Sequence, residues 1–151
     1  MRIDVISDTH GYLSEALLDA LQGADLIVHA GDICSTLDYS QLMSIAPLRL
    51  CLGNNDRPGQ YGPSVGRIDN FIVDGLRWQV CHYQQRLVLP ACDIAICGHT
   101  HRPFIEDTTQ GALLMNPGSP TYPRSIVGPS MGRIYTEGKK IVSSEIILLE
   151  N

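Results

Sequence analysis

Long apolar runs are absent from this sequence, and no stretch approaches the roughly 18 residues that a membrane-spanning helix needs. The first residues, Met1–Asp4, also lack the apolar segment and small-residue cleavage site of a signal peptide. These two absences predict a cytoplasmic protein that does not enter a membrane.

Paired cysteine motifs are missing as well. The five cysteines form an odd set without C-x-x-C spacing, and three of them lie in or beside apolar runs. This pattern favours reduced, mostly buried thiols over a disulfide framework, and it argues against a thiolate zinc site.

Positive charge is scarce: 11 Lys and Arg residues against 16 Asp and Glu residues give a formal net charge of −5. Non-specific binding to a nucleic-acid backbone needs a basic face, so we do not expect it. Two divalent cations would add four charges and bring −5 to −1, placing positive potential where a phosphate could use it.

What the sequence does contain is the material of one folded domain over residues 1–151, with 44% apolar and 18% charged residues and no linker or repeat. Apolar strand patterns cover residues 2–7, 25–30 and 48–52, and helical patterns lie between them. This β-α-β-α-β order predicts parallel strands with crossover helices.

The second half of the sequence has hairpin signals at Asp74-Gly75 and Glu137-Gly138. The further expected strands cover residues 68–73, 76–82, 92–97, 104–106, 112–115, 131–136 and 140–149. We therefore expect a mixed α/β protein, parallel at first and largely antiparallel later. Two sheets face to face with helices outside are one arrangement that fits.

The stretch Cys97-Gly98-His99-Thr100-His101 follows a buried-strand pattern. On an extended segment, imidazoles at i and i+2 point to the same side with their tips ~6–7 Å apart. That spacing suits two neighbouring metal ions better than one. The alternative is a pair of surface histidines in a loop.

Metal-ligand residue types follow five of the predicted strands. These residues are Asp8, His10, Asp32, Asn54, His82, His99 and His101. Ligands of open α/β sheets bind in the crevice at the carboxyl ends of strands, so we expect these side chains to converge. The fifth histidine, His29, lies inside a strand and is interpreted as a packed or supporting residue.

The chemistry of this set indicates a pair of transition-metal ions. Nitrogen and oxygen ligands without thiolate suit Mn, Fe, Co, Ni or Zn better than Ca or Mg. Seven ligands are too many for one ion, whereas one shared carboxylate would give each of two ions four contacts. Asp32 is the expected bridge because Gly31 lets the backbone turn closely there.

In its order, this set of motifs resembles the calcineurin-like metallophosphoesterases. The motifs are Asp8-Thr9-His10, Gly31-Asp32, Gly53-Asn54-x-Asp56, His82, Gly98-His99-x-His101 and Asn116-Pro117-Gly118-Ser119. The short length is most similar to the short prokaryotic phosphodiesterase branch of that superfamily. This branch is also similar in fold to the small retromer subunit, which uses the fold as a binding scaffold.

The resemblance implies a four-layer αββα sandwich of two mixed β-sheets flanked by helices. It also implies a dinuclear-metal-dependent phosphoesterase, with phosphodiesters as the expected small substrates and a metal-bound hydroxide as the nucleophile. One ion would lie on Asp8, His10 and His101, the other on Asn54, His82 and His99, with Asp32 between them. Manganese is the first choice of metal, with Zn, Fe, Ni or Co as alternatives.

Two positions depart from the family pattern. Many relatives have His where this chain has Asn55, and Asn cannot transfer a proton at neutral pH. Protonation of the leaving group would then depend on water or on Asp56. Tyr83 follows His82 where relatives often have Gly, so its ring would reshape the pocket wall.

Three arginines next to the motifs are candidate phosphate contacts, with solvated loop arginines as the alternative. They are Arg57, Arg102 and Arg124. Two other functions stay open at this level: a protein-binding scaffold that has lost hydrolysis, and a metal-binding sensor without chemistry. The presence of all seven ligand types favours the enzyme.

Overall fold

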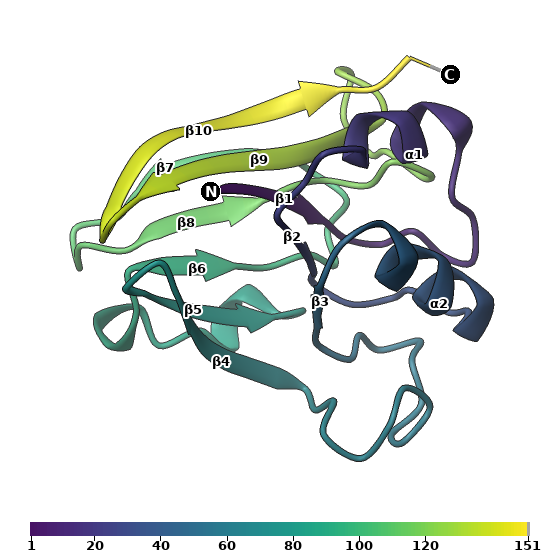
Figure 1. The fold of residues 1–151 in the computed structure, drawn as a ribbon, viewed down its shortest axis with the longest axis horizontal. Coiled ribbons are helices and arrows are strands. Elements are labelled where there is room, and N and C mark those ends of the chain that lie inside the picture. The colour runs from purple at the N-terminus through teal and green to yellow at the C-terminus, as the bar shows by residue number, and fades with distance from the viewer. Residues whose placement is uncertain (151) are drawn as a thin grey trace.

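The computed structural model describes residues 1–150, which form two five-stranded β-sheets (Figure 1). The first sheet has the order β10-β9-β1-β2-β3. Its strands are β1 (Arg2–Ile6), β2 (Leu26–His29), β3 (Leu48–Leu50), β9 (Ser130–Glu137) and β10 (Lys140–Leu148). The second sheet has the order β4-β5-β6-β8-β7. Its strands are β4 (Ile68–Val73), β5 (Leu76–Cys81), β6 (Ile94–Ile96), β7 (Phe104–Asp107) and β8 (Leu113–Asn116).

The two sheets pack face to face over one apolar core. Ile3, Val5 and Val28 of the first sheet belong to the same buried cluster as Trp78 and Ile94 of the second. Residues two apart on a strand share a face, which is why Ile3 and Val5 both point into this core. The buried apolar runs of the sequence thus become the facing surfaces of a sandwich.

Both α-helices cover the outer face of the first sheet. They are α1 (Glu15–Leu21) and α2 (Thr36–Ile45), and each begins at a serine that caps the first turn, Ser14 and Ser35. Leu17 of α1 and Leu42 of α2 are buried in one cluster with Ile27 of β2. The helical stripes of the sequence therefore pack against the sheet that their flanking strands build.

The outer face of the second sheet is covered by two short 3₁₀-helices, η1 (Gln84–Arg86) and η2 (Leu89–Ala91). Leu87 and Leu89 pack there against the buried Ala95 and Leu114. The expected αββα sandwich of two mixed sheets is confirmed, and its fourth layer consists of 3₁₀ turns. The connection from β5 to β6 is formed by residues 82–93 and contains Pro90, whose ring and missing N–H disfavour the interior of an α-helix.

The expectation that the second sheet is largely antiparallel is wrong. Strands β5, β6 and β8 run parallel to one another, and only the edge strands β4 and β7 pair antiparallel. Hairpin turns are visible in a sequence, but the irregular crossovers that bring β6 beside β5 and β8 beside β6 are not. Because of this topology, the carboxyl ends of β5 and β6 lie at the same end of the sandwich as those of β1, β2 and β3.

The strands agree with the sequence pattern to within about two residues at each end. The predicted hairpin turn at Asp74-Gly75 has positive φ at both residues, 55° and 75°, as a tight two-residue turn requires. The five cysteines are unpaired, and only Cys34 among them is not fully buried. No helix in residues 1–150 is both long and apolar enough to cross a membrane.

Candidate metal centre

The loops after β1, β2, β3, β5 and β6 meet at one end of the sandwich. They bring together the seven side chains expected from the sequence, which are Asp8, His10, Asp32, Asn54, His82, His99 and His101. In the parallel pair β1 and β2, Ile6 lies opposite His29, so the loops that follow start at the same level. The convergence follows from parallel strands ending at a common edge.

The first group of side chains is Asp8, His10 and His101. Oδ1 of Asp8 lies 3.2 Å from Nε2 of His101 and 3.6 Å from Nε2 of His10. The two Nε2 atoms are 3.3 Å apart. These three atoms are close enough to share one ion.

The second group surrounds Asp32 and His82. Oδ2 of Asp32 lies 3.4 Å from Nε2 of His82 and also 3.7 Å from Nε2 of His10, so this oxygen stands between the groups. Oδ1 of Asn54 is 3.0 Å from Nε2 of His82 and 3.2 Å from Nδ1 of His99. Asp8 reaches this group too, because its Oδ1 lies 3.8 Å from Nε2 of His82.

Backbone carbonyls fix which ring nitrogens face the cluster. Nδ1 of His82 donates to the carbonyl oxygen of Ala30 at 2.8 Å, and Nδ1 of His101 donates to that of Tyr122 at 2.6 Å. With the proton on Nδ1, each neutral ring turns the lone pair of Nε2 towards Asp8. A carbonyl that holds the far nitrogen of an imidazole is the usual support of a metal-binding histidine.

The side chains of the cluster fit metal ions because atoms with lone pairs face one another there without a hydrogen between them. Oδ1 of Asp8 is buried and has no hydrogen-bond donor among the described residues, although three Nε2 atoms lie within 3.8 Å. When the neutral ring of His82 carries its proton on Nδ1, Oδ1 of Asn54 and Nε2 of His82 are likewise two acceptors at 3.0 Å. Leaving a buried charged acceptor without a partner is costly, and a cation satisfies every atom at once.

The charges of the cluster are coupled. Burial raises the pKa of Asp8, but its interactions with His10 and His101 more than offset this and hold the pKa well below the usual carboxyl range. In the same way burial raises and His82 lowers the pKa of Asp32, with a net decrease. The pKa of His10 is raised mainly by Asp8, and that of His82 is raised by Asp32 against the opposing effect of burial. A bound cation would take the place of these imidazole protons.

The backbone at these side chains differs from the expectation of an extended segment. His99 and His101 have φ values of 73° and 62°, so the argument that they point the same way along a strand is wrong. Asp8, His10 and Asp32 also have positive φ, at 57°, 51° and 61°. Left-handed backbone is uncommon outside glycine and clusters at functional sites, so this concentration in the cluster indicates a site built for binding.

Asp56 lies beneath the cluster. Its carboxylate accepts hydrogen bonds from the backbone N–H groups of Asp32 (2.7 Å), Gly53 (2.8 Å) and Cys34 (3.0 Å). Asp56 is buried, and both of its oxygens are used to tie the loop after β2 to the loop after β3. These bonds give Asp56 a positioning role, and the catalytic role expected from the sequence stays a prediction.

Asn55 is exposed and holds the Asp32 carboxylate. Its backbone N–H donates to Oδ1 of Asp32 at 2.8 Å, and its side-chain Nδ2 donates to Oδ2 at 3.0 Å. These bonds help to lower the pKa of Asp32. Asn55 thus orients the shared carboxylate, and its expected place beside a leaving group stays a prediction.

Arginines surround the cluster in two sets. The three expected ones, Arg57, Arg102 and Arg124, lie exposed in the loops after β3, β6 and β8. Sequence reasoning missed two more, Arg67 and Arg86, which line a cavity of about 250 Å³ beside Asn54. The signal for Arg86 was its place four residues after His82. The signal for Arg67 was its place just before the β4–β5 hairpin, whose second strand ends at Cys81, next to His82.

His29 is buried next to the cluster and is not part of it. Its Nδ1 accepts from the backbone N–H of Gly31 at 3.0 Å, so Nε2 carries the proton and donates to Oγ1 of Thr9 at 2.9 Å. Thr9 lies between Asp8 and His10 in the chain. The sequence-based interpretation of His29 as a supporting residue agrees with these contacts.

Burial lowers the pKa of His29 from 6.5 to about 4. Between these pH values the unfolded chain binds a proton that the folded chain does not, so this residue's contribution to stability falls as the pH drops from 6.5 towards 4. His29→Gln removes the titration, so the difference in unfolding free energy between wild type and variant should change by about 2–3 kcal/mol in favour of the variant from pH 7 to pH 4.5. Urea unfolding in the presence of a chelator measures it, and a difference that is independent of pH would contradict the neutral buried ring.

Comparison with known proteins agrees with the geometry. Residues 1–139 match the family model of the calcineurin-like phosphoesterase superfamily domain. A protein named "probable metallophosphoesterase" from Methanothermobacter thermautotrophicus is 37% identical, with 97% of this chain and 92% of that protein covered. A second such protein, from Methanocaldococcus jannaschii, is 35% identical over 82% of this chain and 70% of its own length.

Solved structures share the fold at lower identity. A Vps29 variant from Entamoeba histolytica superposes with a TM-score of 0.78 at 19% identity, covering 100% of both chains. A structure described as a novel archaeal phosphodiesterase superposes with a TM-score of 0.76 at 22% identity, covering 97% of this chain and 100% of its own. These structures show the fold, and the match of residues 1–139 to the family model together with the 37% identity to the Methanothermobacter protein shows the family: the chain belongs to the calcineurin-like phosphoesterase superfamily.

Proposed function

We propose that this protein is a phosphodiesterase that works with two divalent transition-metal ions. The observation that carries the proposal is the oxygen Oδ1 of Asp8, which is buried without a hydrogen-bond donor in residues 1–150 and faces the Nε2 atoms of three imidazoles. Nitrogen and oxygen donors without thiolate suit manganese, zinc, iron, nickel or cobalt, and the family resemblance makes manganese the first choice among them.

In this proposal the side chains divide as two overlapping sets. Asp8, His10 and His101 hold one ion, and Asn54, His82 and His99 hold the other. Asp32 serves both, since its Oδ2 lies within 3.7 Å of His10 and 3.4 Å of His82. When bound, the ions would lower the pKa of a water molecule to make it a nucleophile and would neutralise the phosphoryl oxygens.

The surrounding residues keep this set in place. Oγ of Ser7 donates to Oδ2 of Asp8 at 2.6 Å, and the backbone N–H of His99 donates to the same oxygen at 3.0 Å. Oδ1 of Asp8 is thereby left to face the imidazoles. Because Asn55 offers no acidic proton, esters with stable leaving groups should be the better substrates.

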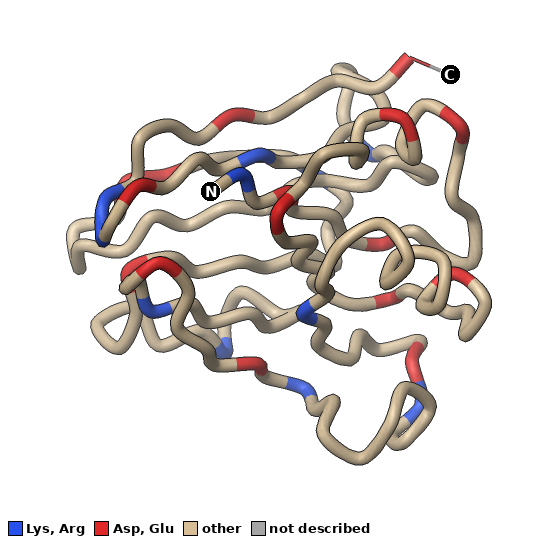
Figure 2. The backbone as a smooth tube through the Cα atoms, in the orientation of Figure 1, with Lys and Arg blue, Asp and Glu red and all other residues tan. Residues whose placement is uncertain are grey.

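The charge distribution also favours a phosphate ester. Four of the arginines form salt bridges with Asp residues, and these are Arg2, Arg49, Arg77 and Arg133. The five that form none with a described carboxylate all lie between strands, in the segments that carry the cluster residues or Tyr122, which supports His101. These are Arg57, Arg67, Arg86, Arg102 and Arg124. The two lysines lie at the β9–β10 turn (Figure 2). Because β9 runs antiparallel to β1, this turn is at the end of the sheet where β1 begins, whereas the cluster follows the end of β1. A chain of net charge −5 thus keeps its unpaired guanidinium groups where a phosphate would enter.

The experiment is hydrolysis of bis(4-nitrophenyl) phosphate by protein purified without chelator and reloaded with manganese. We expect close to two ions per chain, activity that rises from mildly acidic to alkaline pH, and loss of activity on chelation that manganese restores. The pH dependence has this sign because Asp8 and Asp32 raise the pKa values of His10 and His82, so protons compete with metal at low pH.

The same experiment separates the alternatives. Two bound ions without turnover would favour a metal-binding sensor, and turnover that survives thorough chelation would overturn the two-metal proposal. The Vps29 structure at 19% identity shares the fold only, so a protein-binding scaffold gains support from it only if metal and turnover are both missing.

A further inference from the structure

We propose that Arg67 and Arg86 form a second anion subsite beside the metal centre, which selects phosphodiesters whose non-leaving arm carries a negative charge. The inference rests on the proposed function and deepens it by naming a substrate class. It starts from a cavity of about 250 Å³ that is lined by Asn54, Arg67, Tyr83 and Arg86.

This cavity is continuous with the cluster. Asn54, one of its walls, directs Oδ1 to Nε2 of His82 and to Nδ1 of His99. Tyr83, another wall, has its ring centroid 4.8 Å from that of His99 and 5.5 Å from that of His82. A phosphoryl group at the second ion would therefore extend one of its ester arms along Tyr83 into the cavity.

Both guanidinium groups are positioned by the fold. Arg67 directly precedes β4, whose first residue Ile68 pairs with Cys81 at the end of β5, so the hairpin returns Arg67 to the level of His82. Its Nη1 donates to the carbonyl oxygen of Gly53 at 2.8 Å, which leaves further N–H donors of the fork unused by that bond. Arg86 ends η1, and its Cζ lies 5.4 Å from the Tyr83 ring centroid, a cation–π contact that steadies the side chain.

The charge of the cavity is positive and unneutralised. No carboxylate is among its lining residues, and neither Arg67 nor Arg86 forms a salt bridge with a described Asp or Glu. A larger cavity of about 390 Å³ over α1 has the opposite charge, because three carboxylates line it, those of Glu15, Asp19 and Glu150. Two guanidinium groups in one concave site are suited to a carboxylate or phosphate, which they can bind with charge-assisted hydrogen bonds.

A matched pair of chromogenic esters tests the subsite. The first is a 4-nitrophenyl alkyl phosphate whose alkyl arm ends in a carboxylate. In the second, that carboxylate is a methyl ester, so the arm is neutral while the phosphodiester keeps its charge. Each compound is made with arms of two and four methylene groups. We expect the manganese-loaded wild type to prefer the carboxylate by about tenfold or more in kcat/KM at one arm length, mainly through KM. Arg86→Gln and Arg67→Gln should each reduce the preference several-fold, and Arg86→Lys should restore part of it.

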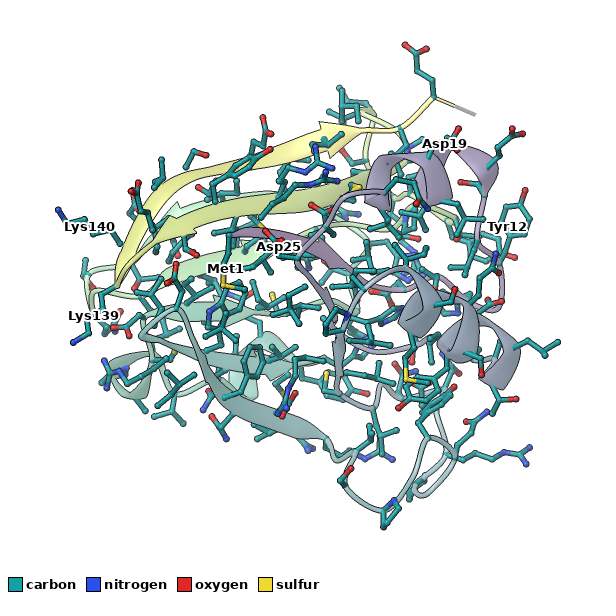
Figure 3. All side chains as sticks on the ribbon, viewed as in Figure 1. Met1, Tyr12, Asp19, Asp25, Lys139 and Lys140 are labelled. Atoms are coloured by element: carbon teal, nitrogen blue, oxygen red, sulfur yellow. The ribbon has the colours of Figure 1, made fainter. Side chains whose placement is uncertain are left out.

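Lys140→Gln is the matched control because it makes the same change of net charge at the β9–β10 turn, far from the cluster (Figure 3). Its carboxylate preference should equal that of the wild type. Hydrolysis of neither ester would overturn the proposed function and the subsite with it. Hydrolysis of both esters with equal kcat/KM, or a preference that survives both arginine-to-glutamine variants, would overturn the subsite alone.

Discussion

Replacing Asp32 with alanine should remove both metal ions and lower kcat/KM for an aryl phosphodiester by about 10³-fold or more. The reason is position: Oδ2 of Asp32 lies between His10 of one group and His82 of the other, at 3.7 and 3.4 Å. Loss of a ligand that belongs to one ion would leave the other in place, whereas loss of a shared ligand weakens both. Metal analysis after dialysis and the chromogenic assay measure the two effects.

Asp19→Ala is the control for this experiment. Asp19 is an exposed carboxylate on α1, outside the cluster, so its removal makes the same change of charge without touching a proposed ligand (Figure 3). It should bind close to two ions and keep wild-type activity. If Asp32→Ala retained one ion at full affinity, Asp32 would not be the shared ligand. Asp8 would then be the better candidate, since its Oδ1 reaches both groups.

The strands could be predicted from the sequence because each is a short apolar run that ends in glycine or a polar turn. Parallel pairing of β1 and β2 followed from the helical pattern between them, and it was enough to predict that Asp8 and Asp32 would lie in one group. The connections from β5 to β6 and from β6 to β8 contain no α-helix, so no helical sequence pattern indicates that these strands run parallel. The parallel pairing of β5 with β6, which brings His82 to His99, therefore lay beyond the local pattern.

The residues of the site could be predicted from the sequence better than the backbone conformation and the loop contacts that position them. Ligand residue types at strand ends are visible in a sequence, whereas backbone conformation is not, and His99 and His101 adopt left-handed φ values in place of an extended segment. Contacts between distant loops are equally hidden. Asp56 accepts from the backbone N–H of Cys34, which is 22 residues away in the chain, and no spacing rule would have assigned it that role.

Gly53→Ala should disable much of the site, although glycine binds no metal. A Cβ at position 53 would overlap Oδ1 and the backbone nitrogen of Asp32, and it would lie 2.8 Å from Cγ of that residue. Asp32 cannot move aside freely, because its N–H and its carboxylate are fixed by Asp56 and Asn55. The added methyl group must therefore push apart the loops that carry Asp32 and Asn54.

The expected result is a metal content well below two ions per chain and a fall in kcat/KM of at least about 10²-fold, since displacement of reacting groups by about 1 Å can cost this much. Gly66→Ala is the matched control: position 66 also lacks a left-handed φ, and a Cβ there meets only the carbonyl oxygen of Ile68 at 3.9 Å. It should keep metal and activity. Gly53 packs between loops outside the apolar core, so far-UV circular dichroism of Gly53→Ala should retain the wild-type strand signal. Full metal binding by Gly53→Ala with an unchanged fold would show that the loops separate without cost, and the close approach of Gly53 to Asp32 would not be required for the site.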